Sequence, residues 1–427
     1  MCKVIIMDRS ENYEVVDISL AAQGMTKLDM AEMEMGALLK IRERFSKEKP
    51  FRGVTIGMAL HVTKETAILV RTLMAGGAKV AITGCNPLST QDDVAAALAK
   101  EGVMVWAYKG ETKEDYYRYI GYVIAQKPQI TIDDGCDLVT EIHSKHPELI
   151  PSIIGGCEET TTGIIRLKAM VRDGALKYPI VAVNDNKTKH LLDNYIGTGE
   201  STWDGIKRGT NVLVSGKTVV VAGYGSCGKG VSLRAKGMGA KVIVTEIDPF
   251  RALQAFYDGY HVMPMEEASR IGDIFITVTG NKHVIKTSHM EKMKDGAIIC
   301  NSGHFDIEID YAGLRKISRK SRELRPLVEE FTLRNGRKII CLAQGRLVNL
   351  SLAEGHPSSV MDTSFCGQSL ACEFLVKNKG KLRPEVVELP GEIDNTISLL
   401  KLATYGVKID KLDAEQVKYL NSWQEGT

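Results

Sequence analysis

The chain has 427 residues, of which 44% are hydrophobic and 25% are charged. This composition is typical of a soluble globular protein with a large core, and it excludes an intrinsically disordered chain. Lys and Arg total 55 while Asp and Glu total 53, which gives a formal net charge of +2. Because the charges nearly balance, we expect neither nucleic acid nor a membrane surface as the main partner.

The chain carries no sequence signal for a membrane or an oxidising compartment. No apolar run reaches the roughly 20 residues that a membrane span needs, and the first residues are too weakly apolar for a signal peptide. The nine cysteines are scattered and form no CxxC pair, so we expect neither a disulfide framework nor a metal site. The sequence therefore predicts a cytoplasmic protein with reduced thiols.

The first half of the chain alternates short β-branched segments with helical segments. We expect strands at 54–60, 79–83, 103–108 and 129–132, and helices at 64–73, 92–100 and 113–125. Such alternation predicts an α/β domain with a mostly parallel sheet.

A second alternating block begins near Lys217. We expect strands at 218–222, 241–246, 273–279, 297–300 and 338–342, and helices at 228–239 and 250–257. The basic segment 315–325 is predicted to be a solvated face. A Lys-rich run after Lys377, followed by Pro384 and Pro390, indicates a boundary before a short helical region. The predicted fold class is α/β, with two doubly wound, Rossmann-like domains and a small C-terminal helical tail.

The segment GYGSCG at 223–228 directly follows an apolar strand and opens a helix. Gly223 permits the tight turn, Gly225 lets a pyrophosphate approach the backbone, and Gly228 allows close packing of helix and strand. Glu246 ends the next strand, where it can bind ribose hydroxyls and repel a 2′-phosphate, which favours NAD(H) over NADP. Arg251, five residues on, slightly weakens that preference. The competing interpretation is a glycine turn in another kind of α/β domain.

Further polar clusters follow the apolar segments, where ligand sites of α/β proteins form. They lie at 60–65, 85–92, 133–135, 158–163, 184–194, 301–306, 345–350 and 355–357. Taken singly, each cluster could be a turn or a helix cap, His61 a structural histidine and Lys189 a surface lysine. The histidines without such a context are expected to be structural: His143, His146, His190, His261, His283 and His289.

The set and order of these clusters resemble one known family. CNxxSTQD at 85–92, EETTTG at 158–163, GYGxxGKG at 223–230 and GHFD at 303–306 are together similar to S-adenosyl-L-homocysteine hydrolases, from about residue 16 to the end. The resemblance implies a substrate-binding domain at 1–190, completed by 354–385, an NAD-binding domain at 191–353 and an oligomerisation tail at 386–427. It also implies a homotetramer with one tightly bound NAD per subunit. Because the sequence ends at Thr427 without the Lys- and Tyr-bearing tail of longer relatives, it resembles the shorter archaeal or thermophilic form.

In this family, NAD takes part in a reaction without net redox change. The ribose 3′-hydroxyl is oxidised, the ketone acidifies the C4′ proton, homocysteine leaves from C5′, water adds, and the ketone is reduced again. The resemblance therefore implies reversible hydrolysis of S-adenosyl-L-homocysteine to adenosine and L-homocysteine, with water excluded while the ketone exists.

The resemblance assigns catalytic roles to His61, Asp134, Glu159, Lys189, Asp193, Asn194 and His304. Lys189 would take the 3′-hydroxyl proton, which we expect to require a lowered lysine pKa. Asp193 and Asn194 would position Lys189, and Glu159 would bind the 2′-hydroxyl. Asp134 and His61 would handle the proton transfers at C4′ and at the leaving or entering group on C5′, and His304 would be a further histidine near the sugar and the homocysteine part.

The resemblance also assigns binding roles. The substrate-binding residues are Thr63, Glu65, His356 and Met361, and the cofactor contacts beyond the glycine turn are Thr160, Thr161, Thr162, Thr279 and Asn349. Glu65 can accept a hydrogen bond from the exocyclic amino group of adenine, whereas the lysine found there in some relatives would prefer a carbonyl. Glu65 thus favours adenosine, but S-inosyl-L-homocysteine stays an alternative substrate. An NAD-dependent 2-hydroxy-acid dehydrogenase and a non-catalytic NAD-binding paralogue are two competing hypotheses for the function.

Overall fold

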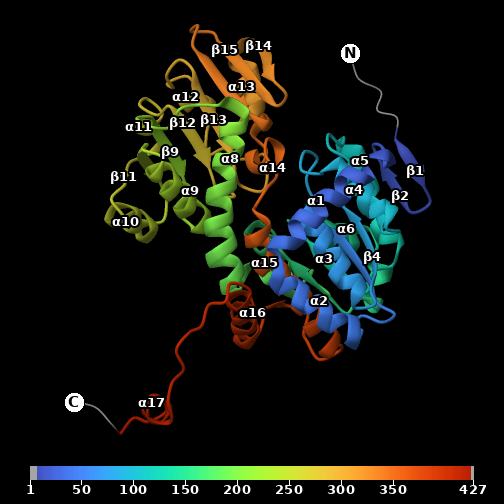
Figure 1. The fold of residues 1–427 in the computed structure, drawn as a ribbon. Coiled ribbons are helices and arrows are strands. Elements are labelled where there is room, and N and C mark those ends of the chain that lie inside the picture. The colour runs from blue at the N-terminus through green and yellow to red at the C-terminus, as the bar shows by residue number, and fades with distance from the viewer. Residues whose placement is uncertain (1–6, 425–427) are drawn as a thin grey trace.

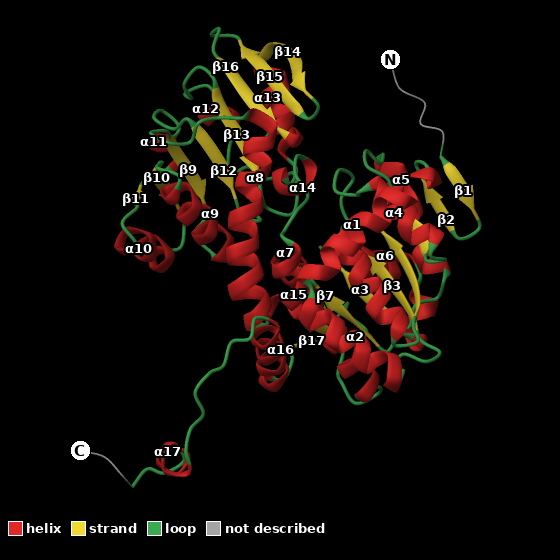
Figure 2. Ribbon diagram, in the orientation of Figure 1, coloured by secondary structure: helices red, strands yellow, loops and turns green. Residues whose placement is uncertain are grey.

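The computed structural model describes residues 7–424, which form two α/β domains followed by a helical tail (Figures 1 and 2). The sheet of the first domain has the strand order β1-β2-β5-β4-β3-β6-β7-β8-β17. These strands are β1 (Asp8–Ser10), β2 (Tyr13–Val15), β3 (Thr55–Ala59), β4 (Lys79–Thr83), β5 (Met104–Trp106), β6 (Ile130–Asp133), β7 (Gly155–Glu158), β8 (Ile180–Ala182) and β17 (Val386–Val387). β1 and β2 pair antiparallel, and β2 to β17 pair in parallel.

Helices cover both faces of this first sheet. One apolar cluster joins the sheet to α1 (Ala21–Glu34), α2 (Gly36–Glu48), α3 (Lys64–Ala75), α4 (Asp92–Lys100) and α15 (Ser358–Lys377). A second cluster joins the opposite face to α5 (Lys113–Ala125), α6 (Asp137–Lys145) and α7 (Thr161–Arg172). The chain thus returns to the first domain after residue 357, and β17, which falls in the expected tail segment, pairs with β8.

The second domain has a sheet of strand order β11-β10-β9-β12-β13-β16-β15-β14. Its strands are β9 (Thr218–Ala222), β10 (Lys241–Thr245), β11 (His261–Val262), β12 (Ile274–Thr277), β13 (Ala297–Asn301), β14 (Ser318–Arg325), β15 (Val328–Leu333) and β16 (Lys338–Leu342). The basic segment at 315–325 is exposed as predicted, but most of it forms an edge strand, β14, paired antiparallel with β15.

Helices also flank the second sheet. They are α8 (Thr198–Thr210), α9 (Ser226–Gly237), α10 (Pro249–Tyr257), α11 (Met265–Ala268), α12 (Thr287–Met290), α13 (Tyr311–Ile317) and α14 (Val348–Ser351). Apolar clusters lie on the two faces of the sheet. Short 3₁₀ turns occur at Ile18–Leu20, Pro147–Ser152, Val183–Asp185 and Ala343–Gly345, and a π-helix spans Thr188–Gly197 between the domains.

Both sheets reverse their strand order at one point, which is where α/β folds bind ligands. In the first sheet the reversal lies between β3 and β6, and in the second between β9 and β12. Loops at the carboxyl ends of these four strands carry His61, Asp134, Gly223 and Thr279. The predicted fold class, with two doubly wound domains of mostly parallel sheet and a helical end, is therefore confirmed.

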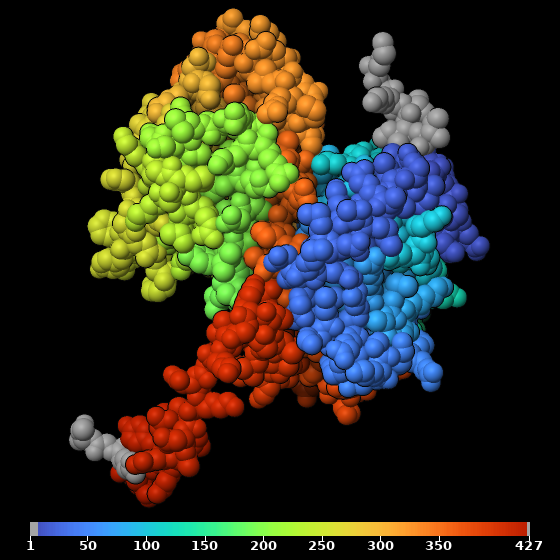
Figure 3. All heavy atoms as spheres, in the orientation of Figure 1, coloured from blue at the N-terminus to red at the C-terminus, as the bar shows by residue number. Residues whose placement is uncertain are grey.

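The tail consists of α16 (Gly391–Thr404) and α17 (Ala414–Leu420). α16 packs against α15, whereas α17 lies at the end of an extended segment that projects from the two lobes (Figure 3). Within residues 7–424 no helix combines the length and apolar character that a membrane crossing requires.

Candidate active site

A cavity of about 890 Å³ lies between the two domains and is lined by residues from both. Each catalytic, substrate-binding or cofactor-binding residue predicted from the sequence lines this cavity, except Gly228. Residues as distant in sequence as Thr63 and Met361 therefore share one site.

The most polar part of the cavity surrounds Lys189. Its ammonium group donates to Asp193 Oδ2 at 2.6 Å and to Asn194 Oδ1 at 3.1 Å, and lies 3.0 Å from Glu159 Oε1. Lys189, Asp193 and Asn194 all lie on the π-helix at Thr188–Gly197. The wider π-helical turn presents residues i, i+4 and i+5 to one point, and such turns are frequent at functional sites.

Lys189 differs from the prediction in its protonation. Burial lowers the pKa of Lys189, but the carboxylates of Asp193 and Glu159 outweigh burial, and the pKa is raised above its usual value. The expected lowering of the lysine pKa is therefore wrong for this arrangement of the site, because two carboxylates lie within hydrogen-bond distance. Lys189 is an ammonium ion here, and it can accept a proton only after passing its own to a neighbour.

Asp193 links Lys189 to His356, which lies just before α15. Its Oδ1 contacts His356 Nδ1, while its Oδ2 accepts from Lys189. Burial raises the pKa of Asp193, but the charges of Lys189 and His356 outweigh it and lower the pKa overall. Asp193 is thus held as a carboxylate that stabilises a positive charge on either neighbour.

Glu159 is anchored by two residues that the sequence analysis missed. Ser364 Oγ donates to Glu159 Oε1 at 2.7 Å, and Gln368 Nε2 donates to Oε2. Both lie on α15, one turn apart. Their only sequence signal is the i, i+4 spacing of two polar residues in a helix of otherwise mostly buried side chains.

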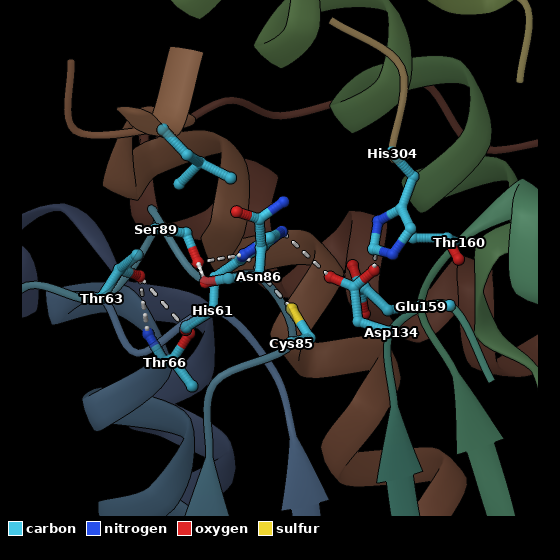
Figure 4. Close-up of polar contacts among 12 residues, drawn as sticks. His61, Thr63, Thr66, Cys85, Asn86, Ser89, Asp134, Glu159, Thr160 and His304 are labelled. Atoms are coloured by element: carbon cyan, nitrogen blue, oxygen red, sulfur yellow. Dashed lines mark hydrogen bonds and ion pairs between the residues drawn. The ribbon is translucent and has the colours of Figure 1, made fainter. Parts of the chain in front are cut away.

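At the other end of the polar region, Asp134 lies between two histidines (Figure 4). His61 Nε2 is 3.3 Å from Asp134 Oδ2, and His304 Nδ1 is 3.1 Å from Asp134 Oδ1. Burial lowers the pKa of His61 to about 4, although Asp134 opposes this shift. His61 is therefore a neutral ring at pH 7, with Ser89 Oγ 2.7 Å from its Nδ1.

Behind Asp134 and Glu159 lies a second pair of carboxyl groups, Asp133 and Glu158. These residues are direct partners in the β6–β7 ladder and are fully buried. Glu158 Oε1 accepts from the backbone N–H groups of Gly135 and Thr160, so it ties together the turns that carry Asp134 and Glu159. Burial raises the pKa of Asp133 to about 7 and raises the pKa of Glu158 well above its usual value. Two adjacent buried carboxyls cannot both ionise at neutral pH, so the pair retains a proton.

The predicted base-binding residues gather at the start of α3. Thr63 is the N-cap of this helix, and Glu65 lies in its first turn. Glu65 Oε1 accepts from Ser358 Oγ at 2.6 Å and lies 3.2 Å from Lys64 Nζ. Glu65 therefore keeps its second carboxylate oxygen for a ligand.

The glycine turn has the geometry expected of a nucleotide site. Gly223 adopts φ +104°, which favours glycine, and a Cβ on Gly228 would lie 2.0 Å from the Gly223 carbonyl oxygen. A Cβ on Gly225 would meet nothing closer than Arg251 Nη1 at 3.7 Å, so the backbone there is open to a ligand. Gly228 does not line the cavity because it packs against the Gly223 turn that follows β9.

Two models of protein families match this chain. The model described as S-adenosyl-L-homocysteine hydrolase matches residues 12–146, and the model described as S-adenosyl-L-homocysteine hydrolase, NAD binding domain, matches residues 194–355. The chain belongs to the S-adenosyl-L-homocysteine hydrolase family. The predicted family and the predicted cofactor, NAD, are both confirmed.

Several relatives of this hydrolase family match over nearly the whole chain. An S-inosyl-L-homocysteine hydrolase from Methanocaldococcus jannaschii is 57% identical, over 97% of this chain and 100% of the relative. An adenosylhomocysteinase from Aquifex aeolicus is 56% identical with the same coverage. Among solved structures, an NAD-bound 3-phosphoglycerate dehydrogenase from Entamoeba histolytica has a TM-score of 0.42 and 16% identity, covering 77% of this chain and 98% of that one.

The residues predicted to contact NAD in this hydrolase are held in place by hydrogen bonds, an arrangement that suits the cofactor. Glu246 Oε2 accepts from the Tyr224 N–H at 2.7 Å, which fixes the carboxylate beside the glycine turn. Thr279 donates to Glu308 Oε2 at 2.7 Å, and Asn349 donates to Ser201 Oγ at 3.1 Å. Glu308 and Ser201 are further buried residues that the sequence analysis missed.

The three threonines after Glu159 lie at the entrance to α7, on the first-domain side of the cavity. Thr160 is the N-cap, and its hydroxyl accepts from the Gly163 N–H at 3.0 Å. Thr161 donates to Asn184 Oδ1 at 3.3 Å, the same oxygen that accepts from Asn194. These contacts join the threonine cluster to the Lys189 site.

Some histidines expected to be structural lie in the site. His190, His283 and His289 line the cavity. His190 Nδ1 is 3.5 Å from Asn194 Nδ2, on the same π-helix. No local sequence signal marks these three residues, because their positions depend on how the two domains meet.

Proposed function

We propose that this chain reversibly hydrolyses S-adenosyl-L-homocysteine to adenosine and L-homocysteine. One observation carries the proposal: the Lys189–Asp193–Glu159 cluster and the nucleotide turn at Gly223 line the same cavity. When bound, NAD supplies the oxidation of the ribose 3′-hydroxyl and its later reduction. Release of a free thiol from S-adenosyl-L-homocysteine tests the proposal, and absence of thiol release contradicts it.

Lys189 is proposed to handle the 3′-hydroxyl proton. Its ammonium must first lose a proton, which the carboxylates of Asp193 and Glu159 oppose as long as both contact it. Replacing one carboxylate contact of Lys189 by a neutral hydroxyl of the substrate would lower the lysine pKa towards the useful range. Glu159, fixed by Ser364 and Gln368, is proposed to hold the 2′-hydroxyl.

Asp134, His61 and His304 are proposed to serve the steps at C4′ and C5′. His61 is neutral at pH 7 because its pKa is about 4, so it can accept a proton without first losing one. Asp134 contacts both rings and can stabilise whichever of them becomes charged. Thr160, Thr161, Thr162, Thr279, Asn349, Glu246 and Arg251 are proposed to contact the cofactor, and Thr63, Glu65, His356 and Met361 the base.

Adenosine is proposed as the nucleoside, rather than inosine. The relatives carry both names at similar identity, so overall similarity does not decide. Glu65 supports adenosine, because its second carboxylate oxygen can accept from the exocyclic amino group of adenine, whereas the carbonyl of hypoxanthine would meet a negative charge.

We expect Glu65→Lys to shift the ratio of kcat/KM values for the adenosine and inosine thioethers at least tenfold towards inosine. Glu43→Lys, on the exposed face of α2, is the control and should leave the ratio unchanged. A wild-type preference for the inosine thioether would contradict the proposal.

A 2-hydroxy-acid dehydrogenase is the second candidate, since it would also use two α/β domains and NAD. Such a dehydrogenase would exchange NADH with solvent and would oxidise or reduce its substrate in each turnover. The hydrolase predicts one retained NAD per subunit, because the oxidised and reduced cofactor alternate within one cycle.

We also propose a cytoplasmic homotetramer with three units at 1–190 with 354–385, 191–353, and 386–427. Exposed apolar residues on and beside α17, such as Leu412, Val417 and Leu420, support an oligomerisation role for the tail.

A further inference from the structure

Helix α16 lies in the expected oligomerisation tail, yet it contacts the segment that carries Lys189. The carboxylate of Asp394, in the first turn of α16, accepts from the backbone N–H groups of Lys187 at 2.8 Å and Thr188 at 3.1 Å. It also accepts from Thr188 Oγ1 at 2.5 Å. Lys189 is the next residue of the chain. Asp394 therefore holds the start of the π-helix, although it lies 206 residues after Thr188.

We propose that Asp394 is a positioning residue for the 3′-oxidation: by fixing the start of the π-helix, it places the ammonium group of Lys189 against Glu159. The effect on the rate rests on the proposed function, since Lys189 matters only if the 3′-hydroxyl is oxidised. Asp394 does not line the cavity, so it acts on the reaction only through the backbone that it holds.

The hydrogen bonds of Asp394 are those of a helix cap. The first N–H groups of a helix have no partner inside it, and a negative charge there is favourable. Asp394 uses Oδ2 for the N–H of Lys187 and Oδ1 for both donors of Thr188. Because Thr188 is only 4% exposed, water has little access to replace these contacts. The carboxylate thus fixes the position and the direction of the chain just before Lys189.

α16 is itself held in place by contacts other than those of Asp394. Ile397, three residues further along α16, is fully buried in the core of the first domain. Ile393 and Leu400 pack against the same apolar cluster. Loss of the Asp394 carboxylate should therefore leave α16 in place and free only the start of the π-helix.

α16 also holds the helix that anchors Glu159. Lys401 donates to Asp362 Oδ2 at 2.8 Å, and this fully buried carboxylate lies on α15. α15 also carries Ser364 and Gln368, which both donate to Glu159. α16, beside α15 in Figure 1, thus contacts two elements: the one that carries the lysine and the one that anchors its carboxylate partner.

Hydrogen exchange of the NAD-loaded enzyme tests the cap without any turnover. In Asp394→Ala, the amides of the segment 187–197 should exchange about tenfold faster, because an uncapped helix start opens more often. Asp17→Ala is the matched control: Asp17 caps the 3₁₀ turn before α1 and accepts from the Ser19 N–H at 2.8 Å. It should leave exchange of 187–197 unchanged. Unchanged exchange in Asp394→Ala would overturn the cap.

The rise in NADH absorbance after mixing with adenosine measures the consequence, since it follows the 3′-oxidation. Asp394→Ala should slow this step about 10–10²-fold, the expected cost of misplacing a catalytic group by about 1 Å. The half-saturating adenosine concentration should change little, because Asp394 does not touch the ligand. Asp394→Asn keeps an acceptor oxygen for Thr188, so its rate should lie between those of wild type and Asp394→Ala. A wild-type rate in both variants would overturn the positioning role.

A double-mutant cycle separates positioning from a general loss of stability. If Asp394 acts through Lys189, adding Asp394→Ala to Lys189→Ala should slow the residual oxidation less than about twofold, because the group to be placed is already gone. Slowing by the full factor seen in the wild-type background would overturn a role through Lys189. Should the enzyme release no thiol from S-adenosyl-L-homocysteine, hydrogen exchange still decides whether Asp394 caps the π-helix, so the two proposals fail separately.

Discussion

At the scale of single residues, the environment of Lys189 is completed by residues from other elements. Lys189 meets Glu159 from the end of β7, and Glu159 is held by α15, about 200 residues further along the chain. The sequence predicts Lys189 and Glu159 because the polar clusters that carry them resemble motifs of the hydrolase family. It does not predict Ser364, since nothing local distinguishes a buried serine that anchors a carboxylate from one that packs.

Lys189→Ala should reduce kcat by about 10²–10⁴-fold, the usual effect of losing a general acid–base group. NAD should stay bound, because Lys189 lies on the substrate side of the cavity and the nucleotide turn is intact. Lys207→Ala, an exposed lysine of α8, is the control. Steady-state kinetics with nucleotide analysis of the denatured protein measures both effects, and an unchanged kcat removes Lys189 from the mechanism.

Asp133 should make the free energy of unfolding depend on pH. An ordinary Asp side chain has a pKa of 3.8, whereas the pKa of Asp133 is about 7 in the folded chain. Between about pH 4 and 7 the folded state therefore holds a proton that the unfolded state has released. This contribution therefore destabilises the fold progressively as pH rises from about 4 to 7. In urea unfolding, the stability of wild type relative to Asp133→Asn should fall over this range. If the stability difference between wild type and Asp133→Asn stays constant or rises with pH, the Asp133–Glu158 pair does not retain a proton.

At the scale of elements, periodicity predicts most central strands and their following helices, because buried parallel strands are continuous apolar runs. It does not predict the π-helix at Thr188–Gly197, since the i, i+4 spacing of Lys189 and Asp193 also fits an α-helix. Nor does it predict β14, whose residues are polar because it is an exposed edge strand.

Helix α9 carries Gly228 and Gly237, two glycines that differ in how tightly they are packed. Gly228→Ala should lower stability by about 1–3 kcal/mol and weaken NAD binding, because its Cβ would lie 2.0 Å from a backbone oxygen that cannot move freely. Gly237→Ala, on the same helix with nothing within 4 Å, should be neutral or stabilising. Thermal unfolding with and without NAD compares them, and equal behaviour of the two variants would contradict the tight packing at Gly228.

At the scale of the whole molecule, the site exists only where the two domains meet. The specific order of motifs predicts which residues share the site. The 3.0 Å contact of Lys189 with Glu159, which contributes to the raised lysine pKa, depends on tertiary packing that the sequence does not encode locally.

The exposed apolar residues of the tail lead us to predict that α17 packs against another subunit. Val417 and Leu420 are 45% and 66% exposed on α17, and a helix this short needs packing against a partner surface to be stable. Replacing both by Glu should reduce the mass of the wild-type oligomer, proposed to be a tetramer, in light scattering. Lys418→Glu, on the same helix, is the control for charge. A wild-type monomer would contradict the oligomer, and an unaffected double variant would exclude α17 from its interface.

The central claim is that NAD stays in the enzyme and returns to its starting redox state in each cycle. The most direct measurement follows thiol release from S-adenosyl-L-homocysteine and the NADH content of the denatured enzyme in the same reaction. We predict many thiols per subunit, with NADH never exceeding one equivalent and NAD-free enzyme inactive. Thiol release by NAD-free enzyme, or NADH rising in proportion to thiol, would contradict the account.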